Sequence, residues 1–94
     1  MNGHPDAREY LERQQQEEKA EDSNTKATDL ADLAHSKWPS VQVKVAHNKK
    51  TPVDALLDIA AKSVYKRAKV EATNALPEEH RAMLVLADFD GVTD

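Results

Sequence analysis

Residues 38–47 read WPSVQVKVAH, and the secondary structure of this stretch decides the fold class of the chain. From Val41 to Ala46 the apolar and polar side chains alternate, with Val at every second position. This alternation has the period of a half-buried strand. Pro39 biases the residue before it away from the helical region, so a preceding helix is expected to end near Trp38. The sequence therefore predicts a strand over 41–46.

Amphipathic helices are predicted on both sides of this strand. Apolar residues at helical spacing predict one helix over 26–37 and a longer one over 52–74. Residues 78–89 fit either a helix or a buried strand, because a helix start signal is followed by the unbroken apolar run 83–87. The predicted fold class is mainly α with one short β-strand, an α+β domain whose strand would pair across a dimer.

The first 22 residues are predicted to form a polar arm. They are rich in helix formers, but Ala20 is the only apolar residue between positions 12 and 21. A segment of this kind cannot offset the entropy of ordering by burying apolar surface. We therefore expect a solvated helix or partly disordered arm over 1–22, a single small domain over 23–90, and an acidic tail over 91–94.

The composition predicts one small domain with a thin core. The chain has 94 residues, of which 14 are Ala, and Ala favours helix while removing little apolar area from water. No Cys is present, so disulfides and thiolate metal sites are excluded. We expect a homodimer, which buries what the monomer cannot. The chain shows neither a signal peptide nor a membrane span, so we expect a cytoplasmic protein without a membrane partner.

Charge is sorted along the chain into three blocks. Residues 1–36 carry a net charge of −5, residues 37–69 carry +6, and residues 70–94 carry −5, which gives −4 for the whole chain. A basic block between two acidic ones can attract a polyanion, or it can fold back on the acidic ends of its own chain. Both outcomes suit a small binding protein.

The residues that usually carry catalysis are not arranged for it. The four His show no pair at metal-ligand spacing, and the two Gly form no phosphate-binding loop. The stretch from Asp88 to Asp94 resembles the first motif of haloacid-dehalogenase-type phosphatases, which would imply a nucleophile at Asp88 and an acid/base at Asp90. The resemblance covers only this short stretch, and none of the family's other motifs follows. We therefore predict a non-enzymatic protein with no cofactor and no metal site.

The basic block supplies the candidate binding residues. The polar face of the predicted strand, the loop after it and the long helix all present amide or cationic side chains. The predicted set for binding nucleic acid or a partner is Gln42, Lys44, His47, Lys49, Lys50, Lys62, Lys66, Arg67 and Lys69. A strand followed by helices resembles the ribbon-helix-helix repressors, although the loop and the helix are longer here. That resemblance implies that Gln42 and Lys44 read bases.

Two functions follow from this set. The first is a small, non-catalytic regulatory protein that binds nucleic acid through the central basic strand, loop and helix. The alternative is a protein–protein interaction module, an inhibitor or adaptor, that binds a partner protein with an acidic patch and no nucleic acid. The sequence names neither the target nor the biological process.

Overall fold

The computed structural model describes residues 5–82, and this part of the chain is helical. Its helices are α1 (Pro5–Glu21), α2 (Ala27–Leu33), α3 (Pro39–His47), α4 (Val53–Lys62) and α5 (Lys66–Ala75). Residues 78–82 are helical as well. Helix accounts for 74% of the described residues and none of them lies in a strand, so the fold is all-α.

The strand predicted over 41–46 is wrong, because these residues belong to α3. Pro39 occupies the first turn of this helix, where its fixed φ suits a helix start, and Trp38 is the extended residue before it (φ −103°, ψ 125°). Val41 and Val45 are one helical turn apart, and both are buried. Alternating valines therefore serve the buried face of a helix here. Because the strand is absent, the predicted α+β class and the predicted strand pairing across a dimer are wrong. The homodimer stays a prediction.

The long helix predicted over 52–74 is also interrupted, and it forms α4 and α5. The break is at Ser63, which has extended dihedral angles (φ −62°, ψ 142°). Its Oγ accepts a hydrogen bond from the backbone N–H of Tyr65 at 3.1 Å. A serine side chain that bonds to nearby backbone in this way competes with helix continuation. The helix predicted over 26–37 corresponds to the shorter α2.

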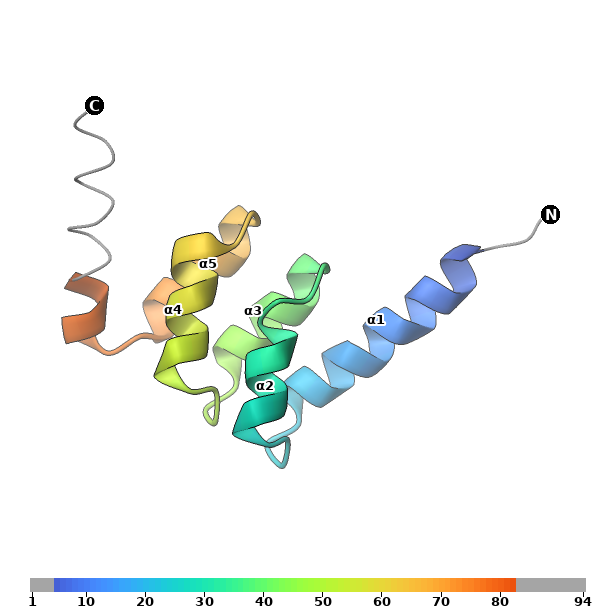
Figure 1. Ribbon diagram of the computed structural model, residues 1–94, viewed down its shortest axis with the longest axis horizontal. Helices are drawn as coiled ribbons and strands as arrows, with labels where there is room; N and C mark the ends of the chain where they lie inside the picture. Colours follow the sequence, from blue (N-terminus) through green and yellow to red (C-terminus); the bar gives the residue numbers. More distant parts are fainter. Residues whose placement is uncertain (1–4, 83–94) are drawn as a thin grey trace.

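The helices are arranged in two layers. Figure 1 shows α2 and α4 in front, with α1, α3 and α5 behind them and running in a common direction. Contacts join α1 to α3, α3 to α5, and α4 to α5, so the elements follow one another as a stack. The molecule is correspondingly elongated, with extents of 50 × 34 × 16 Å.

The pairs α2–α3 and α4–α5 are two copies of one structural unit. The loop that leads into each pair is fastened by a threonine. Thr25 Oγ1 donates to the backbone carbonyl of Lys19 at 2.6 Å, and Thr51 Oγ1 donates to that of Val45 at 2.6 Å. Stacked helix pairs that contact only their neighbours are the architecture of α-solenoids.

The turn inside each pair is built alike as well. Ser36 Oγ accepts the backbone N–H of Trp38 at 3.2 Å, and Ser63 Oγ accepts that of Tyr65 at 3.1 Å. Each serine lies in the turn between the two helices of its pair, and the aromatic residue two positions later is the N-cap of the second helix. The sequence analysis missed this repeat, because its shared residues are single polar side chains and not a long motif.

A buried glutamine joins the two units. The side chain of Gln42 in α3 donates from Nε2 to the carbonyl of Ser36 at 2.7 Å, and its Oε1 accepts from Ser63 Oγ at 2.7 Å. Gln42 is 6% exposed, so both bonds are shielded from water. The equivalent residue of α1 is Gln16, whose Oε1 accepts from Ser36 Oγ at 2.8 Å. Each glutamine therefore holds the turn of the next unit.

The predicted polar arm forms α1, and this helix packs against α3. Ala20 is fully buried, like the equivalent Ala46 of α3 and Ala72 of α5. Such small residues let neighbouring helices approach closely, since the distance between helix axes depends on the side chains at the contact. The first half of α1 instead exposes two large apolar side chains, Tyr10 at 55% and Leu11 at 57%.

Several sequence predictions lie outside the described residues. They are the choice between helix and strand beyond Ala82, the acidic tail over 91–94, and the phosphatase-like stretch from Asp88 to Asp94. Within residues 5–82, no helix is both long and apolar enough to pass through a lipid bilayer.

Gln42→Ala is expected to lower the free energy of unfolding by about 1–3 kcal/mol, because it removes a buried amide and leaves the partly buried Ser36 carbonyl and Ser63 hydroxyl without their partner. Urea denaturation followed by circular dichroism measures this change. The matched control is Gln15→Ala on the exposed face of α1, for which we expect a change within about 0.5 kcal/mol. Equal stability of the two variants would contradict the structural role of Gln42.

Candidate functional site

The residues of the predicted basic block belong to α3, to the turn after it, to the end of α4 and to α5. Lys44 and His47 of α3 come together with Arg67 of α5 along one groove. The other cationic residues of the set lie on the exposed turn after α3, at the end of α4, or elsewhere on α5: Lys49, Lys50, Lys62, Lys66 and Lys69. The strand of the predicted strand, loop and helix is absent from the described residues, while nucleic-acid binding by these side chains stays a prediction.

The Gln42 side chain is bonded within the fold, at the edge of a further hollow of about 290 Å³ that Ser36 and Ser63 also line. Both ends of its amide are used within the fold, and it is among the buried residues. The base-reading role that the ribbon-helix-helix resemblance implied depended on a strand that does not exist here. Sequence analysis could not anticipate this, because a glutamine between valines looks the same on an exposed strand face and in a buried bridge.

Three side chains of the central block pair with the acidic ends of the chain. The pairs are Lys37 with Glu9 at 3.4 Å, Lys44 with Glu21, and His47 with Glu71 at 2.6 Å. Each joins the central block to one of its acidic neighbours, which is the fold-back outcome considered from the charge pattern. An exposed pair of this kind contributes about 0–1 kcal/mol, so these contacts position side chains more than they stabilise the fold.

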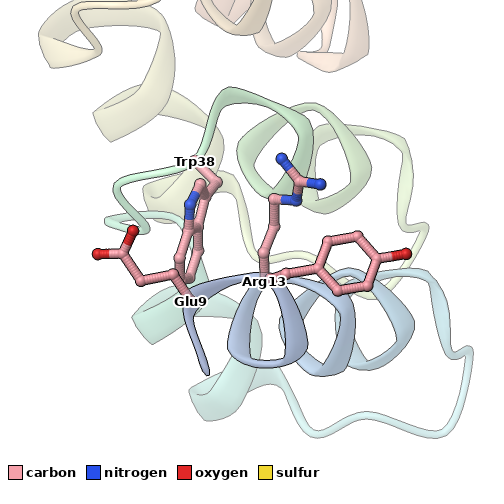
Figure 2. A pocket seen from close by; sticks show the side chains of 4 residues that line it. Glu9, Arg13 and Trp38 are labelled. Atoms are coloured by element: carbon pink, nitrogen blue, oxygen red, sulfur yellow. The ribbon is translucent and has the colours of Figure 1, made fainter. Parts of the chain in front are cut away.

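A pocket of about 270 Å³ lies where α1 meets the start of α3. We call it the aromatic corner, and it is lined by Glu9, Tyr10, Arg13 and Trp38. Figure 2 shows the side chains of Glu9 and Arg13 rising from α1 on either side of the Trp38 indole. Glu9 and Arg13 share a helix face because they are one turn apart. Trp38 is the only Trp of the chain.

Charged groups hold the rings of the aromatic corner in place. Lys37 Nζ lies 4.8 Å from the centroid of the Trp38 ring, and it also pairs with Glu9. The guanidinium of Arg13 lies 5.5 Å from the centroid of the Tyr10 ring. Cations over aromatic faces are attracted by the negative face of the ring. The corner therefore offers half-exposed rings with cations beside them, which suits an apolar side chain flanked by a carboxylate.

Sequence analysis missed this site because it assigned residues 1–22 to a featureless polar arm. The sequence did contain one signal for this site: Glu9 and Arg13 are four residues apart, so in a helix they lie on the same face near Tyr10. What the sequence did not contain was the contact between α1 and Trp38, which depends on the tertiary stack. Trp38 packs against the core and also lines the pocket.

A second hollow lies between α3 and α5, on the layer that also contains α1. We call it the α3–α5 groove; it has a volume of about 460 Å³. Its lining residues are Pro39, Ser40, Val43, Lys44, His47 and Arg67. It begins beside the aromatic corner, because Pro39 directly follows Trp38.

The described residues contain no further arrangement that resembles a catalytic or metal centre. His35 and Asp58 pair at 3.7 Å on the other layer, away from the His47–Glu71 pair. Residues 5–82 hold no group of three acidic or histidine side chains placed to share a metal ion. Comparison of the chain with protein-family models, with curated proteins and with solved structures returned no match. The two hollows on the α1–α3–α5 layer are thus the candidate functional surface.

His47→Ala is expected to raise the pKa of Glu71. The hydrogen bond from His47 is the main cause that holds the pKa of this carboxyl below its ordinary value, and the charges of His47 and Arg67 act in the same direction against the opposing effect of burial. A carbon NMR titration of the Glu71 carboxyl measures the change. Asn74→Ala, an exposed change on the same helix, is the control and should leave the titration unaltered.

The sign of the pH effect follows from the lowered pKa. Glu71 contributes stability at pH values above its ordinary pKa, and this contribution is lost as the pH falls through the folded value. In His47→Ala, the free energy of unfolding should therefore fall less steeply as the pH is lowered through the acidic range. An unchanged Glu71 titration in this variant would contradict the assignment of His47 as the cause.

Proposed function

We propose that this protein is a protein–protein interaction module that binds its partner through the aromatic corner. The observation that carries the proposal is the convergence of Trp38, Tyr10 and Arg13 on one pocket at the surface. Trp, Tyr and Arg are the residue types most enriched among the few that dominate binding energy at protein interfaces. Here they come from two helices that are distant in sequence, so the fold assembles them.

The exposure of the corner supports this proposal. Tyr10 is 55% exposed and Leu11 beside it is 57% exposed, although both are large apolar side chains. A tyrosine buries roughly 200 Å² when it is fully covered, and covering the exposed half is worth about 2–3 kcal/mol before the costs of association. This apolar area stays in contact with water in the monomer, and a partner that covers it gains the corresponding free energy of burial.

The stack of helix pairs also supports a binding role. The repeated Thr, Ser and Gln hydrogen bonds fix each unit against the next, so α1 is held across the start of α3 without a thick core. Helix-pair stacks of this type present long, open surfaces, and these are the surfaces that they use for binding. The aromatic corner is therefore preorganised, which lowers the entropy cost of association.

The charges favour a protein partner over nucleic acid. Two of the residues predicted to contact phosphates, Lys44 and His47, already have carboxylate partners. Affinity for nucleic acid requires several cations aligned along a phosphate backbone. The interaction module is thus the better supported of the two functions considered from the sequence.

Tyr10→Ala is expected to weaken partner binding by at least about tenfold, since it removes an exposed ring of the aromatic corner without opening the core. The assay selects peptides of about 12 residues from a random display library on the full chain, a length that spans roughly 40 Å when extended. Fluorescence anisotropy then measures the affinity of each selected peptide for the wild type and the variant.

The matched control is Val64→Ala, which shortens an 86% exposed apolar side chain between α4 and α5. We expect this control to bind the selected peptides as the wild type does. If no peptide is selected, or if the selected peptides bind Tyr10→Ala with full affinity, the aromatic corner is not the binding site. Retardation of duplex DNA or single-stranded RNA by the wild type and by Tyr10→Ala alike would favour nucleic-acid binding instead.

A further inference from the structure

We infer that the α3–α5 groove is the second half of the same binding surface and takes an acidic side chain of the partner segment whose apolar side chain enters the aromatic corner. This inference rests on the proposed function and names the chemistry of the partner: an extended peptide segment with an apolar residue followed or preceded by Asp or Glu. Continuity supports it, because Trp38 lines the corner and Pro39, the next residue, lines the groove.

The lining of the groove selects for an acidic group. Its apolar part is formed by Pro39 and Val43, and its charged residues are Lys44, His47 and Arg67. Among the described residues, no acidic side chain lines the groove itself. Glu21 and Glu71 lie beside it and are bonded to Lys44 and His47. A carboxylate that enters the groove meets the guanidinium of Arg67, whereas a basic group meets the like charges of Lys44 and Arg67.

Arg67 is the anchor for this carboxylate. Lys44 and His47 are each engaged by one glutamate, but no ion pair within residues 5–82 involves Arg67. Its side chain is exposed at the first turn of α5. A guanidinium has five N–H donors in a planar fork that matches the two oxygens of a carboxylate. Arg67 is therefore the cation in the groove with the most unused donor capacity.

The carboxylates beside the groove set the place of binding. Ser40 and Lys44 bond to Glu17 and Glu21, so the side of the groove toward α1 is bordered by carboxylates. The opposite side has Arg67, and its neighbouring Glu71 is occupied by His47. Carboxylates therefore border the groove on both sides, and the place for a further carboxylate is at the Arg67 guanidinium, which forms no ion pair within residues 5–82.

The length of α3 limits the spacing between the aromatic corner and the site of the acidic residue, because the lining residues of the groove on α3 run from Pro39 to His47. A helix rises about 1.5 Å per residue, so the nine steps from Trp38 to His47 cover roughly 13 Å. An extended segment covers this distance in about four residues. The apolar anchor and the acidic residue of the partner are therefore expected about three to five positions apart.

The test uses the peptides selected on the full chain by the display experiment above. We expect Asp or Glu to be enriched about three to five positions from an aromatic or aliphatic residue, as the helix rise requires. Arg67→Gln should then weaken binding of these peptides by about tenfold, because a charge-assisted, bidentate bond is lost. Peptides in which that acidic residue is changed to its amide should bind the wild type and Arg67→Gln equally.

A charge swap and a matched control separate a local contact from general electrostatics. Arg67→Glu should regain affinity for a peptide in which the acidic residue is replaced by Lys, while circular dichroism shows the same helix content as the wild type. Lys49→Glu, which reverses an exposed cation on the turn after α3 and outside the groove, should change affinity by less than about twofold.

The outcomes distinguish this inference from the proposed function. Selected peptides that lack acidic residues and bind Arg67→Gln with full affinity, yet are lost on Tyr10→Ala, would overturn the inference and leave the interaction module in place. Equal losses for Arg67→Gln and Lys49→Glu would also overturn it, since the effect would then come from net charge. A failure to select any peptide, or displacement of the peptides by duplex DNA, would overturn both proposals.

Discussion

The buried side-chain amide of Gln42 is the interaction on which the helix stack depends. It binds the turn of its own unit at the Ser36 carbonyl and the turn of the next unit at the Ser63 hydroxyl, so one side chain spans the boundary between them. Because a buried polar group must keep its partners, the two units cannot shift against each other without a free-energy cost. Gln16 holds the turn at Ser36 from α1 and extends the same register to the first helix.

This register explains how a chain rich in Ala supports an ordered surface. The buried alanines at the ends of α1, α3 and α5 occupy equivalent positions, where small side chains let successive helices pack closely. In a stack, each unit needs contacts only with its neighbours, so a thick core is not required. The same arrangement places α1 across the start of α3 and creates the aromatic corner. It also pairs Lys44 and His47 with glutamates at the surface, and Arg67 is then the cation of the α3–α5 groove that forms no ion pair within residues 5–82.

The sequence predicts the helical character of this chain well and its breaks poorly. The apolar stripe that begins near Val53 is a real buried face, but the helix stops at Ser63, where neither Gly nor Pro marks the end. The valines after Pro39 fit both a strand and a helix, and only burial on a neighbouring helix decides between them. Of the predicted site residues, the basic side chains of Lys44, His47 and Arg67 line one groove, whereas the side chain of Gln42 is buried. The aromatic corner could not be predicted, because it joins side chains from separate helices.

The most direct test of this account is the solvent exchange of glutamine side-chain amides in solution NMR. The Gln42 side-chain NH₂ donates in a buried bridge, so we expect it to exchange slowly with solvent, together with helical carbon chemical shifts from Val41 to His47. The exposed amides of Gln14 and Gln15 provide the internal reference and should exchange rapidly. Fast exchange at Gln42, equal to that of Gln14 and Gln15, or strand-like shifts across α3, would contradict the account.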